Sequence, residues 1–350
     1  KIASPKKVKK YLTALLRSMG HHDQNRELDL EQLADSSWQV AAQQLAVEIT
    51  AEGKIDLGRN IKELVIVPDH FYWYVPFEAL WVGDDRERTL LAKTRVRYAP
   101  TFGLTKADAR GRPQSGDYAI VVGSLYPRED ETLGQTAFKQ IQAVVPRGHA
   151  IEDSLQVPSH ILAVMLDGLV VLDDLTSSGQ DPLSLAPFRV DEGLPGSSIR
   201  QWLSLPWGSP DVIVLPGFHT PAENSLKKIS TLNRAGDELF LTSMGLLAAG
   251  SRTIVLSRWR TGGQTSTDLI REFIQELPNT TAQDSWQRAV QIAQETTIDP
   301  AVEPRVKESK EGTEITARHP FFWSGYIVID PGLKAQEKQP ESPDLEFPKK

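Results

Sequence analysis

Short apolar runs separated by amphipathic stretches give the chain an alternating pattern of expected strands and helices. The clearest unit spans residues 211–259, in which Val212–Leu215 and Thr253–Leu256 are typical of buried parallel strands. Between these runs, Glu238–Ala249 places its apolar residues on one helical face and is followed by Gly250, where a C-cap is expected. The pattern predicts a strand–helix–strand unit. Its first strand ends in a loop, which is where α/β folds commonly hold their functional residues.

Further apolar runs extend this pattern over most of the chain. Strands are predicted at Glu63–Pro68, Leu90–Thr94, Val96–Tyr98, Tyr118–Gly123, Ser159–Leu166 and Phe321–Ile329, with Leu169–Leu172 as a neighbouring strand or hairpin. Amphipathic helices are predicted at Lys6–Met19, Leu30–Thr50, Thr132–Val144 and Gln283–Glu295, and another after Thr265. This alternation predicts an α/β fold with a mostly parallel central sheet flanked by helices, plus N-terminal helices.

Composition divides the chain into three parts. Residues 1–60 are expected to form an N-terminal helical segment, residues 61–332 the main domain, and residues 333–350 a charged, proline-rich, disordered tail. The charged stretch Asp299–Arg318 lacks hydrophobic periodicity and is expected to be a long mobile insertion. Because the chain begins at Lys1 rather than at methionine, we expect it to be a piece of a longer protein. The first 60 residues then either end an upstream helical region or form an appendage of the main domain.

Composition also excludes several classes of function. The chain has no cysteine, so it has no disulfide, no thiolate metal ligand and no cysteine nucleophile. Its net charge of −7, without a basic cluster, argues against nucleic acid as a partner. No apolar run approaches the roughly 18 residues of a membrane span, so we expect no membrane partner and a cytoplasmic location. Asp167, Asp173 and Asp174 are interpreted as turn and cap residues, and we expect neither a metal nor a cofactor.

Five motifs in order give the chain a resemblance to a known family. They are LVIVPDHFYWYVPFEAL at Leu64–Leu80, VRYAPT, YAIVVGSLYP, the GDELF…LSRW segment that ends at Trp259, and HPFFWSGYIVI at His319–Ile329. In this order they resemble CHAT domains, caspase-like peptidase domains often found behind tetratricopeptide repeats. The resemblance covers roughly Lys62 to Asp330. It implies a caspase-like three-layer sandwich, related in fold to caspases and separase.

The resemblance also implies where catalysis occurs in active members, which use a His–Cys dyad. The histidine lies in a His-Gly pair after one central strand, and the cysteine lies in a loop after the next. Here the resemblance places Asp167-Gly168 at the first position and Phe218 at the cysteine position, while Thr220 matches the family's threonine. A degenerate dyad implies that no catalytic residue remains. The two loops, 167–168 and 216–221, are expected side by side at the carboxyl ends of adjacent parallel strands.

Residues around these loops are candidates for peptide binding. The candidates are Gly168, Gly217, His219, Thr220, Arg258 and Trp259. His219 is expected to be a solvent-facing loop residue, and pairing with Asp167 is expected to be a packing detail. The resemblance places Arg258 and Trp259 at the rim of the substrate pocket, with structural packing as the favoured role of Trp259.

Three hypotheses of function follow. The first is a pseudo-peptidase that binds a protein or peptide partner through the pseudo-active cleft or the N-terminal helices. The second is a hydrolase with a relocated nucleophile, which requires a Ser or Thr oxygen within about 3.2 Å of His219 or His160. The third is a structural element of a multidomain protein, which an exposed apolar patch on Leu12, Leu15 and Leu16 would support.

Overall fold

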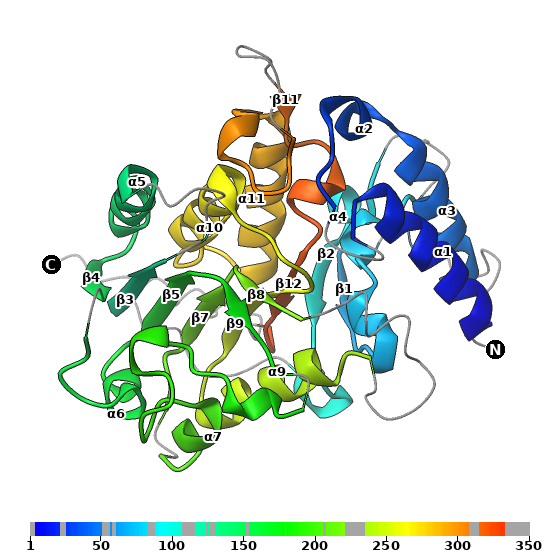
Figure 1. Ribbon diagram of the computed structural model, residues 1–350. Coiled ribbons are helices and arrows are strands. Elements are labelled where there is room, and N and C mark those ends of the chain that lie inside the picture. The colour runs from blue at the N-terminus through cyan, green and yellow to red at the C-terminus, as the bar shows by residue number, and fades with distance from the viewer. Residues whose placement is uncertain are drawn as a thin grey trace, which may run out of the picture.

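An eight-stranded sheet forms the centre of the computed structural model (Figure 1). In spatial order its strands are β1 (Glu63–Ile66), β2 (Arg95–Tyr98), β12 (Tyr326–Ile329), β9 (Thr253–Ser257), β7 (Val212–Leu215), β5 (Gly168–Leu172), β3 (Asp117–Val122) and β4 (Arg147–Ile151). All neighbours run parallel except β12 and β9, which are antiparallel. The structure describes residues 4–21, 26–50, 57, 61–82, 88–106, 116–123, 125, 131–151, 154–178, 180–205, 208–220, 235–307 and 315–332.

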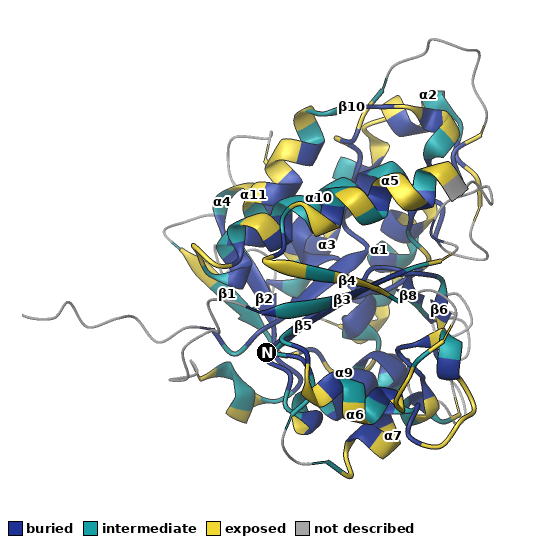
Figure 2. Cartoon of the chain, turned by 90° about the vertical axis from the view of Figure 1, so that its left-hand side faces the viewer, coloured by how far each residue is buried: buried dark blue, intermediate teal, exposed yellow. Residues whose placement is uncertain are grey.

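Helices cover both faces of this sheet and give the molecule three layers (Figure 2). One face carries α5 (Glu131–Gln142), α10 (Gly263–Glu276) and α11 (Ala282–Glu295), and the other carries α6 (Ser159–Val164), α7 (Ile199–Trp202) and α9 (Asp237–Ala249). The other α-helices among the described residues are α1 (Pro5–Ser18), α2 (Leu30–Ala34), α3 (Ser37–Ile49) and α4 (Leu90–Lys93). The predicted α/β class, with a mostly parallel sheet between helices, is therefore confirmed.

The crossover between β7 and β9 forms as the hydrophobic pattern predicts. Every residue of both strands is buried, because helices cover the two faces of the sheet at this point. The connecting helix α9 ends at Ala249, and Gly250 follows with a φ of 122°, a conformation that favours glycine. Asp237 and Glu238 occupy its first turn, where acidic side chains complement the helix dipole.

The N-terminal helices share the hydrophobic core of the main domain. Leu12, Leu15 and Leu16 on α1 are fully buried, so the exposed patch that would have supported the third hypothesis is not present on these residues. Arg305 fixes the chain after α1 by donating hydrogen bonds to the backbone oxygens of Gly20 (2.7 Å) and Arg26 (3.0 Å). The helices of the N-terminal segment are thus packed into the same body as the sheet.

Two predicted strands are helices instead. Ser159–Leu166, predicted as a buried strand, contains α6, and Leu90–Thr94 contains α4. In α6, Ser159 and Ala163 are buried while Val164 and Met165 are exposed, which is the spacing of an amphipathic helix. The strand in this part of the sheet is β5, which contains Leu169–Leu172, the run expected to be a neighbouring strand or hairpin.

The expected mobile insertion is partly ordered. Within Asp299–Arg318, Pro300–Val302 form a 3₁₀ turn, and β11 (Ile315–Thr316) pairs antiparallel with β10 (Thr297–Ile298), which directly precedes this stretch. Residues 308–314 and the tail 333–350 lie outside the described residues. Among the helices that the structure describes, none combines the length and apolar character needed to cross a membrane.

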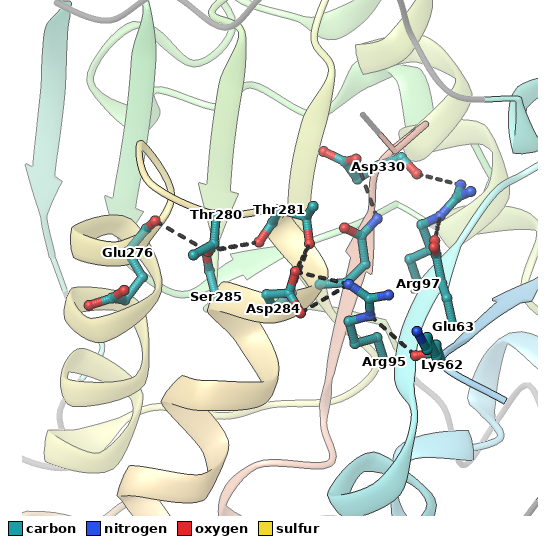
Figure 3. Close-up of polar contacts among 11 residues, drawn as sticks. Lys62, Glu63, Arg95, Arg97, Glu276, Thr280, Thr281, Asp284, Ser285 and Asp330 are labelled. Carbon is teal, nitrogen blue, oxygen red and sulfur yellow. Dashed lines mark hydrogen bonds and ion pairs between the residues drawn. The ribbon is translucent and has the colours of Figure 1, made fainter. Parts of the chain in front are cut away.

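Polar contacts tie the β1–β2–β12 side of the sheet to α11 (Figure 3). Arg95 on β2 donates two hydrogen bonds to the carboxylate of Asp284, at 3.0 and 3.1 Å. The backbone N–H of Asp284 in turn donates to the hydroxyl of Thr281, the N-cap of α11. Arg97 bridges Glu63 on β1 and the carbonyl oxygen of Asp330 after β12. These contacts fix the three strands β1, β2 and β12 at one end of the sheet.

Candidate functional site

The loops that follow β5 and β7 meet at the carboxyl ends of these adjacent parallel strands. After β5 the chain passes through Asp173 and Asp174 into the short strand β6 (Leu175–Thr176), and after β7 it enters β8 (Phe218–His219). β6 and β8 pair in parallel, so the two loops form one corner. Gly217 makes this approach possible, because a Cβ at this position would lie 1.9 Å from the backbone oxygen of Asp173.

His219 lies between a carboxylate and a hydroxyl in this corner. Its Nδ1 is 3.0 Å from Oδ1 of Asp174, and its Nε2 is 3.2 Å from Oγ1 of Thr176. The tautomer that carries its proton on Nδ1 directs this N–H toward the carboxylate of Asp174 and the carbonyl oxygen of Gly217 (3.4 Å), and it leaves Nε2 free to accept from the threonine hydroxyl. The His219 side chain is only 16% exposed and belongs to β8, so the expectation of a solvent-facing loop histidine is wrong, whereas Thr176 is exposed.

The charges around the corner keep Asp174 ionised. The imidazole of His219 beside it holds the pKa of the Asp174 carboxyl below its usual value, with further help from Arg260 and Arg189 and against the opposing effect of burial. Arg260 pairs with Asp174 at 3.3 Å, and Arg189 pairs with Asp173 at 3.3 Å. The two arginines are about half exposed while their aspartates are 25% and 8% exposed. The corner therefore presents positive groups to solvent although the chain is acidic overall.

Phe218 and Thr220 belong to the framework of the corner. The Phe218 side chain is fully buried, and its carbonyl oxygen accepts a hydrogen bond from the hydroxyl of Ser257. Thr220 is 3% exposed, and its hydroxyl lies 2.6 Å from the hydroxyl of Tyr74. Neither side chain offers a reactive atom to solvent. Position 221, the last of the predicted loop, lies outside the described residues.

Asp167 and Gly168 do not lie in this corner. They stand at the amino end of β5, where the backbone oxygen of Asp167 accepts from the N–H of Val212 (3.1 Å) at the start of β7. The side chain of Asp167 accepts from the N–H of Asp117 (3.1 Å). The predicted neighbourhood of the 167–168 and 216–221 loops is wrong, because residues 159–164 form a helix and the strand begins only at Gly168. The carboxylate beside His219 is Asp174, not Asp167.

Arg258 is also absent from the solvent-facing part of the site. Its side chain is fully buried and pairs with Glu78 at 3.2 Å. It also donates to the backbone oxygens of Trp73 (3.0 Å) and Ser324 (2.8 Å) and lies over the ring of Tyr98. A guanidinium that is satisfied in this way cannot contact a peptide, so the structure contradicts a place for Arg258 on the cleft rim.

Trp259 likewise packs inside the molecule. It is 1% exposed, and its ring stacks on His21 with centroids 4.3 Å apart. His21 also stacks on Phe321, a residue of the segment between β11 and β12. The side chain of Trp259 therefore joins the N-terminal segment to the sheet, and it does not line a peptide-binding cleft.

The comparisons with known proteins place the chain in a family. The family model for the CHAT domain matches residues 28–182 and 224–330. The chain belongs to the CHAT domain family. The match to the CHAT model begins before Lys62, where the motifs of the resemblance begin, and so includes α2 and α3. No curated protein sequence matches this CHAT domain.

Solved structures give looser likenesses to this CHAT domain. Two structures of the Saccharomyces cerevisiae separase–securin complex match at 8% and 10% identity, with TM-scores of 0.46 and 0.42. They cover 95% and 83% of this chain, but the chain spans only 22% and 17% of theirs. Pyridoxal kinase from Staphylococcus aureus matches at 10% identity with a TM-score of 0.27, over 57% of this chain and 99% of that chain.

Sequence reasoning missed two residues of the corner in this CHAT domain. Asp174 was interpreted only as a turn residue, and Thr176 was not considered as a partner of His219. A signal for Asp174 was present, since two aspartates directly follow the apolar run of β5. Thr176 had no such signal, because its place depends on the pairing of two strands of only two residues each.

Proposed function

We propose that this CHAT domain is a protein-binding module without cysteine peptidase chemistry. The observation that carries the proposal is Phe218, which the family resemblance places at the position of the cysteine nucleophile, in a chain without any cysteine. Its ring is fully buried after β7 and has no nucleophilic atom. Loss of a protease nucleophile lowers the rate by about 10⁶-fold, so peptide turnover by the family's dyad chemistry is not expected.

The proposed binding surface is the corner around Arg189 and Arg260. Both guanidinium groups are about half exposed, and each retains donors beyond the aspartate that it pairs with among the described residues. Arginine forms bidentate hydrogen bonds with carboxylates, so a partner segment that bears Asp or Glu side chains fits this surface. Charge complementarity of this kind favours both the rate of encounter and the choice of partner.

A peptide-binding measurement tests this proposal. Immobilised peptides of varied charge are screened with the labelled domain, and the best acidic sequences are measured in solution by fluorescence anisotropy. Arg260→Glu is expected to weaken binding at least tenfold. Arg288→Glu is the matched control, because Arg288 is 59% exposed and pairs with one carboxylate, Glu276, away from the corner. Equal affinity in both variants would contradict the corner as the binding surface.

A second candidate, a hydrolase with a relocated nucleophile, is favoured by one observation. The hydroxyl of Thr176 lies within the 3.2 Å of His219 that this hypothesis requires.

The third candidate, a purely structural element, loses its stated support because Leu12, Leu15 and Leu16 are buried. Two apolar side chains of α3, Val40 and Val47, remain 58% and 47% exposed.

A further inference from the structure

Thr176, His219 and Asp174 form a line of contacts that partner binding does not require. Asp174 faces Nδ1 of the imidazole at 3.0 Å, and Thr176 faces Nε2 at 3.2 Å. A carboxylate on one ring nitrogen and a hydroxyl on the other is the arrangement by which hydrolases activate a hydroxyl nucleophile. An exposed threonine needs no histidine for its hydrogen bonds, because water can satisfy its hydroxyl.

The backbone fixes this arrangement. Thr176 on β6 and His219 on β8 are register partners, so their side chains are cross-strand neighbours. On either side of Thr176, the N–H of Leu175 donates to the backbone oxygen of Gly217 (3.0 Å) and the N–H of Ser177 donates to the backbone oxygen of His219 (3.1 Å). Strand pairing therefore brings the two side chains next to each other before any side-chain torsion is set.

We propose that Thr176 is a nucleophile that accepts acyl groups from activated esters, with His219 as its general base and Asp174 as a positioning residue. The proposal goes beyond partner binding and rests on the second candidate function. Asp174 is itself held by Arg260, which pairs with its other carboxylate oxygen at 3.3 Å. This pair restrains the carboxylate that orients the imidazole.

The reaction is an acyl transfer whose atoms balance without a cofactor. Oγ1 of Thr176 forms a bond to the carbonyl carbon of the ester, and its proton passes to Nε2 of His219. The bond from the carbonyl carbon to the phenolic oxygen breaks, and the leaving phenolate takes up the proton. The products are one acyl ester on Thr176 and one phenol. Water activated by the same imidazole can later hydrolyse this acyl ester and restore the hydroxyl.

The substrate class follows from what the corner supplies. A hydroxyl and a base suffice for an ester with a good leaving group, because a phenolate departs readily. Amide bonds have a much more basic leaving group and depend on a preorganised oxyanion site. The proposal therefore concerns activated esters and leaves the expected absence of peptide turnover unchanged.

The test is acetylation of the full chain by 4-nitrophenyl acetate. Nitrophenolate release is followed by absorbance, and peptide mapping by mass spectrometry locates the acetyl group. We expect an acetyl ester on Thr176 that is absent in Thr176→Val and retained in Thr176→Ser. His219→Gln is expected to slow acetylation at this residue by about 10²-fold or more. Thr297→Val is the matched control, because Thr297 is also an exposed threonine in a two-residue strand, and it is expected to react like the wild type.

The split between rate constant and substrate affinity separates the positioning role of Asp174 from a merely structural one. The charged groups around the imidazole are Asp174, which it contacts, and Asp173, Arg189 and Arg260. In Asp174→Ala the imidazole loses the carboxylate beside Nδ1, so the maximal acetylation rate at Thr176 is expected to fall while the ester concentration that gives half of this rate stays the same, and Asp174→Glu is expected to restore part of the rate. A folded Asp174→Ala variant that acetylates Thr176 at the wild-type rate contradicts the assigned role.

The results that overturn the proposal are equally plain. If acetyl groups are found only on lysines or the amino terminus, Thr176 is not a nucleophile. If Thr176 is labelled equally in His219→Gln and in the wild type, His219 is not its general base. Circular dichroism melts of each variant show that it is folded, and the conservative serine variant guards against a loss of structure. Because labelling uses no partner, its failure leaves the peptide-binding result untouched, and the reverse also holds.

Discussion

The carboxylate of Asp174 lies 3.0 Å from Nδ1 of His219, across the junction of the loops that follow β5 and β7. Two aspartates follow β5, and a phenylalanine with a histidine beside it follows β7. The contact between Asp174 and His219 therefore joins the carboxyl ends of two neighbouring central strands.

Arg258 is expected to be critical for stability. Its buried guanidinium neutralises Glu78, whose side chain is 3% exposed. Burial raises the pKa of the Glu78 carboxyl, and Arg258 opposes that rise. Removal of Arg258 by Arg258→Ala leaves the acid without its partner and is expected to cost about 3–5 kcal/mol. Denaturant unfolding measures this, with Arg288→Ala as an exposed control expected within about 0.5 kcal/mol of wild type. A loss below about 1 kcal/mol for Arg258→Ala would contradict this account.

Glu303 is expected to make stability depend on pH. It is buried, and its Oε1 accepts hydrogen bonds from the N–H (2.7 Å) and hydroxyl (2.8 Å) of Thr265 in the first turn of α10. Burial raises the pKa of its carboxyl from 4.5 to about 8. Because the folded state holds the proton more tightly, this contribution to stability is present below pH 4.5 and is lost as pH rises through about 8.

The measurement for Glu303 is the melting temperature across this pH range. Glu303→Gln replaces the carboxyl with an amide, whose oxygen can still accept the hydrogen bonds of Thr265 and which does not titrate. The melting temperature of the wild type is expected to fall relative to this variant between about pH 4.5 and 8. Glu192→Gln, at an exposed carboxyl, serves as the control. A constant difference between the wild type and Glu303→Gln across the range would refute the prediction.

Gly217 is expected to tolerate no side chain. A Cβ there would lie 1.9 Å from the backbone oxygen of Asp173, which cannot move away as a flexible side chain can. Gly217→Ala is expected to cost about 1–3 kcal/mol and to separate β6 from β8. Gly103→Ala provides the comparison, because its nearest neighbour would be 4.0 Å away. Equal unfolding midpoints for the two variants would show that the loops do not approach so closely.

The N-terminal helices are expected to be indispensable to the fold. Leu16 on α1 is fully buried, whereas Val47 on α3 is 47% exposed. Leu16→Ala is expected to lower the free energy of unfolding by about 2–5 kcal/mol, because it removes buried apolar contacts and leaves a cavity. Val47→Ala should cost far less. Similar losses for the two variants in urea unfolding would mean that α1 is only loosely attached.

The sequence predicted the central crossover well because its local signals agree. Val212–Leu215 and Thr253–Leu256 are apolar runs bounded by turn residues, and the helix between them ends at a glycine. Ser159–Leu166 was misread because a short apolar run has no periodicity that separates a buried strand from a short amphipathic helix. That error moved the expected site from the carboxyl end of β5 to its amino end.

The contacts of the corner itself could not be predicted. Thr176 and His219 are 43 positions apart and meet only through the pairing of β6 with β8. The burial of Arg258 likewise depends on Glu78, 180 positions away. Such contacts arise from tertiary packing, which leaves no local pattern in the chain.

The most direct test of the central claim is an assay of peptide cleavage. The purified chain is incubated with a proteome-derived peptide library that includes basic, acidic and apolar residues at every position, and new amino termini are counted by mass spectrometry. Because the family resemblance aligns the buried Phe218 with the cysteine nucleophile of active members, we predict no cleavage above buffer. Reproducible cleavage that disappears in His219→Ala would contradict the account.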